Sequence, residues 1–106
     1  MDANQDAGRW GALADGTRLA IVACLADGPR AVGQLAAGLP VSRSAVSQHL
    51  KILKDAGLVE DVAAGTRRIY RLNPAALAAL RDQLDTYWQR ALAGYAQAAE
   101  APDEEG

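Results

Sequence analysis

The spacing of apolar residues in the middle of the chain predicts a helix with one buried face. Val46, Leu50 and Leu53 follow the i, i+4, i+7 spacing of a core-facing stripe. Ser42 precedes them and has the side chain of a good N-cap. The opposite face carries only polar side chains: Arg43, Ser44, Ser47, Gln48 and Lys51. The segment 42–54 is therefore predicted to be a helix whose polar face is available for binding.

Apolar residues at helical spacing predict four further helices. Three precede the segment 42–54, at 9–14, 17–26 and 32–39, and one follows it at 74–98. Asn73 is a suitable N-cap for the last helix, and proline is favoured at the first helical position that follows. The helix 32–39 and the helix 42–54 are close enough in sequence to form a helix–turn–helix, with Pro40 in the turn.

Two β-rich runs between the helices predict a hairpin. They cover 58–62 and 67–72 and flank a turn that contains Gly65. Arg67 and Arg71 fall on one face of the second strand and Arg68 on the other, so both faces of the hairpin carry cations.

This order of elements predicts a winged helix–turn–helix fold, which is mainly α with a small β-hairpin. A chain of 106 residues is the length of one domain. We expect that domain at 9–98, with disordered tails at 1–8 and 99–106, where the residues are small, polar or acidic.

The distribution of charge favours a nucleic-acid partner although the net charge is −2. Six carboxylates lie at the two ends of the chain, and without them the middle carries +4: Asp2, Asp6, Glu100, Asp103, Glu104 and Glu105. The local charge of a surface, rather than the pI of the chain, decides whether it attracts phosphate.

Composition argues against several other classes of protein. No run of about 18 apolar residues predicts a membrane span, and no basic start followed by an apolar stretch predicts a secretory signal. A single cysteine, Cys24, excludes an internal disulfide and fits a reducing cytoplasm. The sequence offers no nucleophile with a base at useful spacing and no glycine-rich phosphate loop, so no enzyme and no cofactor are predicted.

Side-chain chemistry suggests how the polar helix could read double-stranded DNA. One exposed helix fits the major groove, where Arg43 could pair with guanine and Gln48 with adenine. Ser44 and Ser47 are short enough to bond a base or a phosphate. The remaining cations are predicted to contact phosphate, which positions the protein without specifying sequence. The full predicted DNA-binding set is Ser42, Arg43, Ser44, Ser47, Gln48, Lys51, Lys54, Arg67 and Arg68, in the helix 42–54 and a wing at 63–71.

The first and last helices carry more apolar surface than one small core requires. This excess predicts a homodimer interface, for which the candidates are Trp10, Leu13, Leu77, Leu80, Leu84, Tyr87, Trp88, Ala91 and Tyr95. The alternative is that Tyr87 and Trp88 complete the core of a single chain.

Two isolated residues have alternative interpretations. Cys24 is either a small buried apolar residue or a redox- or metal-sensing thiol, and its apolar neighbours favour the first. His49 lies between the polar and apolar faces of the helix 42–54. It is expected to pack or to contact backbone, with a DNA contact as the alternative.

Several segments resemble the ArsR/SmtB family of bacterial repressors. They are 13–22, 32–36, 41–53 and 57–59, which read LADGTRLAIV, VGQLA, VSRSAVSQHLKIL and GLV. The resemblance continues through 65–72 into the last helix and covers about 9–95. It implies a homodimer built from the first and last helices that binds an imperfect palindrome and represses its own or a neighbouring operon. The Tyr87–Trp88 pair resembles a subgroup with no known metal site.

The resemblance also implies that this chain does not sense metal. Members that bind metal through the third helix have cysteine where this chain has Ala31. Members that bind metal through the last helix have aspartate and histidine where this chain has Pro74 and Ala76. An inducer, if there is one, would be of another kind. The turn also differs from the general helix–turn–helix pattern, which often has glycine where this chain has Pro40.

The residues therefore favour a metal-independent DNA-binding repressor. The alternatives are a protein-interaction module that keeps the helical scaffold without binding DNA, or a sensor of a small ligand or of thiol oxidation. The acidic tail motivates the first alternative, and Cys24 or a pocket between the long helices would serve the second.

Overall fold

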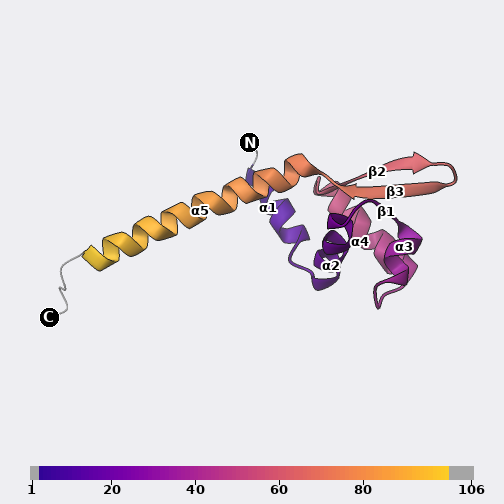
Figure 1. Ribbon diagram of the computed structural model, residues 1–106, viewed down its shortest axis with the longest axis horizontal. Coiled ribbons are helices and arrows are strands. Elements are labelled where there is room, and N and C mark those ends of the chain that lie inside the picture. Colours follow the sequence, from indigo (N-terminus) through magenta and orange to yellow (C-terminus); the bar gives the residue numbers. More distant parts are fainter. Residues whose placement is uncertain (1–2, 101–106) are drawn as a thin grey trace.

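The chain forms a small helical body with a β-hairpin at one end and a long helix that projects from the other. The computed structural model describes residues 3–100, and Figure 1 shows this arrangement. In chain order the elements are α1 (Ala3–Ala12), α2 (Gly16–Ala26), β1 (Arg30–Ala31), α3 (Val32–Ala37), α4 (Arg43–Asp55), β2 (Val59–Ala64), β3 (Arg67–Leu72) and α5 (Pro74–Glu100).

The core lies where α4 crosses the other helices. Val46, Leu50 and Leu53 of α4 have no exposed surface, as their spacing predicts. They pack with Ile21 of α2 and Leu35 of α3, and with buried residues from β2 and the start of α5. Because α4 is covered on one side by this cluster, its polar side faces outward.

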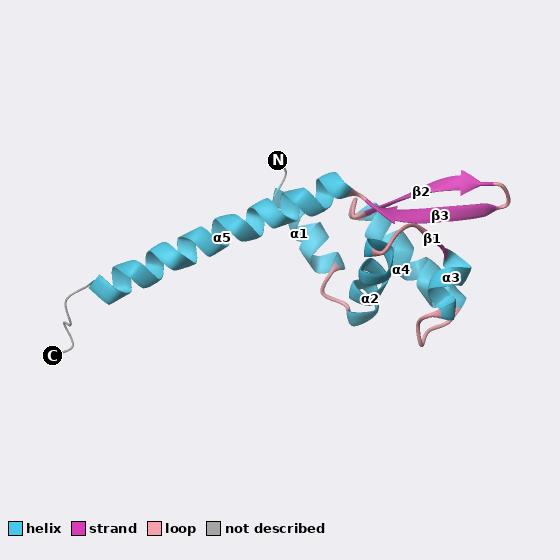
Figure 2. Cartoon of the chain, in the orientation of Figure 1, coloured by secondary structure: helices cyan, strands magenta, loops and turns pink. Residues whose placement is uncertain are grey.

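The three strands form one antiparallel sheet in the order β1-β3-β2 (Figure 2). The hairpin pairs Val59 with Leu72 at its base and Ala64 with Arg67 at its tip. Gly65 in the turn has a φ of 65°, a left-handed conformation that favours glycine. Strand β1 adds a third strand at the base of the hairpin, where Arg30 pairs with Tyr70.

The helix ends confirm the predicted caps Ser42 and Asn73, and Asp15 caps α2 in the same way. The carboxylate of Asp15 accepts hydrogen bonds from the backbone N–H groups of Thr17 (2.8 Å) and Arg18 (3.1 Å) at the start of α2. Ser42 Oγ accepts from the backbone N–H of Ala45 at 3.1 Å. Asn73 Oδ1 accepts from the backbone N–H of Ala75 at 3.1 Å. These polar side chains satisfy amides that a helix leaves without an internal partner.

Several boundaries differ from the predicted ones, and one strand was not predicted. Helix α1 begins at Ala3 rather than at residue 9, so the prediction of a disordered tail is wrong for residues 3–8. Alanine and glutamine in this stretch favour a helix, whereas Asn4, Asp6 and Gly8 disfavour it, so the local sequence gives no clear signal for the start of α1. Helix α3 ends at Ala37 because Gly38 follows as its C-cap, and α5 continues to Glu100 rather than ending near residue 98. The strand β1 was not predicted at all.

The tails at residues 1–2 and 101–106 lie outside the described residues. Within residues 3–100, no helix combines the length and apolarity needed to cross a membrane.

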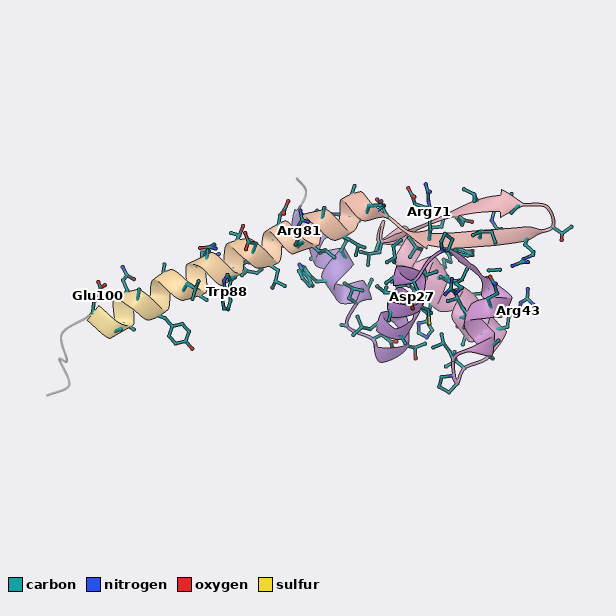
Figure 3. The ribbon with its side chains drawn as sticks, in the orientation of Figure 1. Asp27, Arg43, Arg71, Arg81, Trp88 and Glu100 are labelled. Atoms are coloured by element: carbon teal, nitrogen blue, oxygen red, sulfur yellow. The ribbon has the colours of Figure 1, made fainter. Side chains whose placement is uncertain are left out.

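Helix α5 serves the core only at its beginning. Ala76 and Leu80 are buried there, and α1 packs beside this part of the helix. The indole Nε1–H of Trp10 donates a hydrogen bond to Oε1 of Gln83 and so joins α1 to α5. Beyond this contact α5 continues for several turns without covering any other element (Figures 1 and 3).

Candidate DNA-binding surface

Helix α4 presents its polar side chains on one continuous exposed face. Its predicted binding residues are all exposed: Ser42, Arg43, Ser44, Ser47, Gln48 and Lys51. The helix is held by its buried stripe, and its first turn is fixed by the cap at Ser42. The structure therefore combines a rigid helix with an accessible row of hydrogen-bonding groups.

Arg43 lies at the start of this face, beside the first turn of α3. A Cβ atom built on Gly33 would lie 3.6 Å from Nη1 of Arg43, so the guanidinium group lies over the N-terminal turn of α3. Arg43 forms no ion pair with any carboxylate in the part of the chain that the structure describes. Figure 3 shows Arg43 on the helical side of the molecule, below the hairpin, whereas Arg71 lies on the hairpin itself.

An open hollow of about 610 Å³ separates Arg43 from the wing. It is lined by the start of α3, by Arg43 and by Thr66, Arg67 and Arg68 of the wing. Oε1 of Gln34 accepts a hydrogen bond from the backbone N–H of Ala31 (2.8 Å) and another from Nη2 of Arg67 (3.3 Å). Three arginines make the hollow basic, which suits a sugar–phosphate backbone.

Gln34 and Thr66 were not predicted as members of this surface. Gln34 lies in the helix 32–39, which is predicted as the first helix of the helix–turn–helix, and Thr66 is a turn residue without charge. The signal available for Gln34 was its position three residues after the N-cap Ala31, from which its side chain can reach back to the N-cap amide.

The predicted phosphate-binding cations are mostly engaged with carboxylates. Asp61 receives two of them: Lys54 Nζ lies 2.8 Å from its Oδ1, and Arg68 Nε lies 2.6 Å from its Oδ2. Lys51 pairs with Asp55 at 3.0 Å, one turn later on α4, and both side chains are well exposed. Exposed pairs of this kind are weak, so Lys51 stays available to a phosphate.

Asp61 is the most enclosed of these carboxylates, since its side chain is only 5% exposed. Hydrogen bonds from Lys54 and then from Arg68 lower the pKa of Asp61, although burial alone would raise it. The carboxylate is thus held in its charged form between two cations. Sequence alone gave no reason to place Lys54 and Arg68 on one acceptor.

His49 contacts a side chain that was not anticipated. Its Nδ1 lies 3.3 Å from Nη1 of Arg18, whose Nε donates to the backbone carbonyl of Ala12 at 2.7 Å. The same Arg18 contributes its backbone N–H to Asp15, and this hydrogen bond is the main cause of the lowered pKa of Asp15. His49 is half-buried at the inner edge of α4, between the exposed face and the core.

Cys24 is partly buried and packs against the core cluster, in agreement with its interpretation as a small apolar residue. No group of three His, Cys, Asp or Glu side chains among residues 3–100 is arranged to hold a metal ion. Three residues stand where the resemblance places metal ligands in other members. Ala31 is buried at the end of β1, and Pro74 and Ala76 lie in the first turn of α5.

The predicted interface residues fall into two groups. Leu13, Leu77 and Leu80 pack into or against the core of the chain, and Leu80 is only 5% exposed, so it offers little surface to a partner. The others are exposed on α1 or on the projecting part of α5: Trp10, Leu84, Tyr87, Trp88, Ala91 and Tyr95. Leu92, which was not among the predicted interface residues, is also exposed.

The fold and the exposed face of α4 together define a winged helix–turn–helix DNA-binding domain. Comparisons with known proteins agree. The model of the family described as "bacterial regulatory protein, arsR family" matches residues 15–61. The HTH-type transcriptional regulator Rv2034 of Mycobacterium tuberculosis is 69% identical over 88 residues, which are 83% of this chain and 82% of that protein.

Two further relatives extend the comparison. The HTH-type transcriptional repressor SmtB of M. tuberculosis is 48% identical over 61 residues, 58% of this chain and 45% of SmtB. A solution structure from Mycobacterium bovis, of a homodimeric winged helix–turn–helix DNA-binding domain, is 34% identical, with a TM-score of 0.68 over 79% of each chain. The chain belongs to the ArsR family of bacterial transcriptional regulators, and it is a regulator rather than an enzyme.

Proposed function

We propose that this chain is a homodimeric, sequence-specific transcriptional repressor that binds an imperfect DNA palindrome without needing a metal. The observation that carries the proposal is the division of α4 into two faces. One face has Val46, Leu50 and Leu53 completely buried, and the other exposes Arg43 and Gln48 beside a basic wing. A helix held in this way can enter the major groove as a rigid unit.

Within the proposal, the exposed residues divide into base readers and phosphate contacts. Arg43 and Gln48 have the planar, bidentate groups that recognise guanine and adenine. Ser42, Ser44 and Ser47 accept or donate single hydrogen bonds at close range. The phosphate backbone of the DNA is contacted by Lys51, Lys54, Arg67 and Arg68. Gln34 fixes the direction of the Arg67 side chain.

The exposed apolar side of α5 supports the dimer. Trp88 is 59% exposed and Tyr95 is 76% exposed in the single chain. Large aromatic side chains in a row are unusual on a monomer surface and are typical of interfaces. The homodimeric relative from M. bovis assembles with the same fold. In a two-fold dimer the two α4 helices would read half-sites about one helical turn apart.

Repression and metal independence rest on different observations. The relative SmtB is named a repressor. Ala31, Pro74 and Ala76 have no side-chain atoms that could bind a metal where metal-binding members have ligands.

The test is fluorescence anisotropy with labelled DNA from upstream of the gene that encodes the chain, compared with random DNA of equal length. We expect the upstream DNA to bind more tightly, with an affinity that falls steeply with salt. Chelator or added zinc should leave the affinity unchanged. No binding to either DNA at micromolar protein would contradict the proposal and favour the protein-interaction module; release by zinc would contradict metal independence.

A further inference from the structure

The carboxylate of Asp61 joins the recognition helix to the wing. We propose that Asp61 is a positioning residue of the DNA-binding surface, which holds Lys54 of α4 and Arg68 of β3 at a fixed separation so that helix and wing meet the DNA in one register. The inference rests on the proposed DNA binding. It gives a role to Asp61, whose negative charge and position in the sequence do not by themselves indicate one.

The geometry gives each cation its own acceptor. Lys54 Nζ bonds Oδ1 at 2.8 Å, and Arg68 Nε bonds Oδ2 at 2.6 Å. Lys54 belongs to the last turn of α4, whereas Arg68 lies on β3, two positions along from the residue that faces Asp61. The three residues therefore form the only ion-paired bridge from α4 to the hairpin among the residues that the structure describes.

An acidic residue beside two phosphate-binding cations could also act as a competitor of DNA. Exposure argues against this role: the Asp61 side chain is 5% exposed, whereas Lys54 and Arg68 are 50% and 58% exposed. The cations therefore cover the carboxylate and face the solvent. Arg68 gives only its Nε–H to Asp61 and keeps the donors on its two terminal nitrogens, and an ammonium group has three N–H donors.

Such a bridge improves DNA recognition because it orders the side chains of Lys54 and Arg68 before the DNA binds. Free lysine and arginine side chains lose conformational freedom when they bind phosphate, and this cost opposes association. Side chains already held by Asp61 lose less. Because only one placement of the DNA meets both cations and the base-reading face of α4, the gain applies to specific complexes more than to random ones.

The experiment compares Asp61→Asn with Glu60→Gln in the full chain. Glu60 is the neighbouring carboxylate on β2, and its cation partner is Arg71 of β3 at 3.0 Å rather than a residue of α4. Both substitutions remove one negative charge from the same strand. The measured quantity is the ratio of affinities for specific and random DNA at fixed salt.

We expect Asp61→Asn to lower this ratio about three- to tenfold, and Glu60→Gln to leave it unchanged. Equal ratios in the two variants, or tighter binding of Asp61→Asn to both DNAs, would overturn the inference. If wild type binds neither DNA, the proposed function fails as well. If wild type discriminates and Asp61→Asn discriminates equally, only this inference fails.

A second set of variants keeps the test valid if Asp61→Asn does not fold. Lys54→Gln, Arg68→Gln and their combination retain Asp61. Because a carboxylate that keeps only one of its two cations is free to rotate, the loss of either cation changes the placement of the other, and we expect their effects on specific affinity to be non-additive. Additive losses would overturn the role of Asp61 as a bridge.

Discussion

At the scale of single residues, the binding properties of the candidate DNA-binding surface depend on which of its cations have carboxylate partners. Arg43 lies over the first turn of α3 without a carboxylate partner among residues 3–100, whereas Lys54 and Arg68 share Asp61. A cation without an acidic partner can turn its whole hydrogen-bonding capacity towards DNA. Arg43 should therefore have the largest effect on sequence preference.

Replacing Arg43 by alanine should weaken specific DNA binding by about 1–3 kcal/mol if it pairs with guanine, and should weaken random binding much less. Anisotropy titrations on both DNAs give the two values. Arg81→Ala is the matched control, since Arg81 is an exposed arginine on α5, away from α4 and the wing. Equal losses on the two DNAs would show that Arg43 contacts phosphate instead of a base.

Asp15 and Asp61 should make the free energy of unfolding depend on pH in the acidic range. The folded state lowers the pKa of Asp15, mainly through the Arg18 amide, and of Asp61, mainly through Lys54. Folding therefore favours the ionised forms. This stabilisation is complete above the unfolded pKa of about 4 and is lost as the pH falls through the lower folded values.

Asp15→Asn and Asp61→Asn should each be less stable than wild type near neutral pH and should lose less stability on acidification. Urea denaturation at a series of pH values measures the free energy of unfolding. Asp82→Asn is the control, because Asp82 is an exposed carboxylate on α5 whose partner is the adjacent Arg81. A wild-type pH profile shared by all three variants would contradict the assignment.

At the scale of elements, α4 depends on its buried stripe. Leu50→Ala should lower the free energy of unfolding by about 2–5 kcal/mol, because Leu50 is fully buried and its removal leaves a cavity. Ile52→Ala on the same helix should cost far less, since Ile52 is 43% exposed. Urea denaturation of the two variants measures the difference. Similar losses would mean that α4 packs differently from the structure described.

The helices could be predicted because their signals are local. Apolar spacing, the caps Asp15, Ser42 and Asn73, and the turn at Gly65 are all readable within a few residues. Strand β1 is two residues long and exists only through its pairing with β3, so no periodicity could reveal it. The start of α1 could not be predicted from apolar spacing, because residues 3–8 contain no large apolar side chain.

Most residues of the candidate surface could be predicted from the sequence, but the contacts between them could not. Charge and helical phase identified the exposed residues of α4. The sharing of Asp61 by Lys54 and Arg68 depends on the register of the hairpin and on its packing against α4. Contacts between residues distant in sequence are set by tertiary structure, and a single sequence carries no direct signal for them.

At the scale of the whole molecule, α5 extends the protein to 69 Å along its longest axis. A helix of 27 residues is about 40 Å long, and only its first turns contribute to the core. The remainder would expose Trp88, Leu92 and Tyr95 to water if the chain stayed alone. In the proposed dimer, a second copy would cover this apolar surface and place two α4 helices on one particle.

Replacing Trp88 by aspartate should convert the dimer to a monomer at micromolar concentration, because the charge would enter an apolar interface. Light scattering after gel filtration measures the mass. Specific DNA affinity should fall together with the mass, since the two half-sites would be bound by unlinked chains. Gln89→Asp introduces the same charge one position along α5 and should leave the mass unchanged; a dimeric Trp88→Asp protein would exclude this part of α5 from the interface.

The guanidinium group of Arg18 connects helix α1, which carries part of the proposed dimer interface, to helix α4. Arg18 donates through Nε to the carbonyl of Ala12, the last residue of α1, and contacts His49 of α4 through Nη1. Since a guanidinium is planar and stiff, α1 cannot shift against α4 without breaking one of these two contacts. In the proposed dimer, the distance between the reading helices would therefore be set inside each chain as well as at the interface.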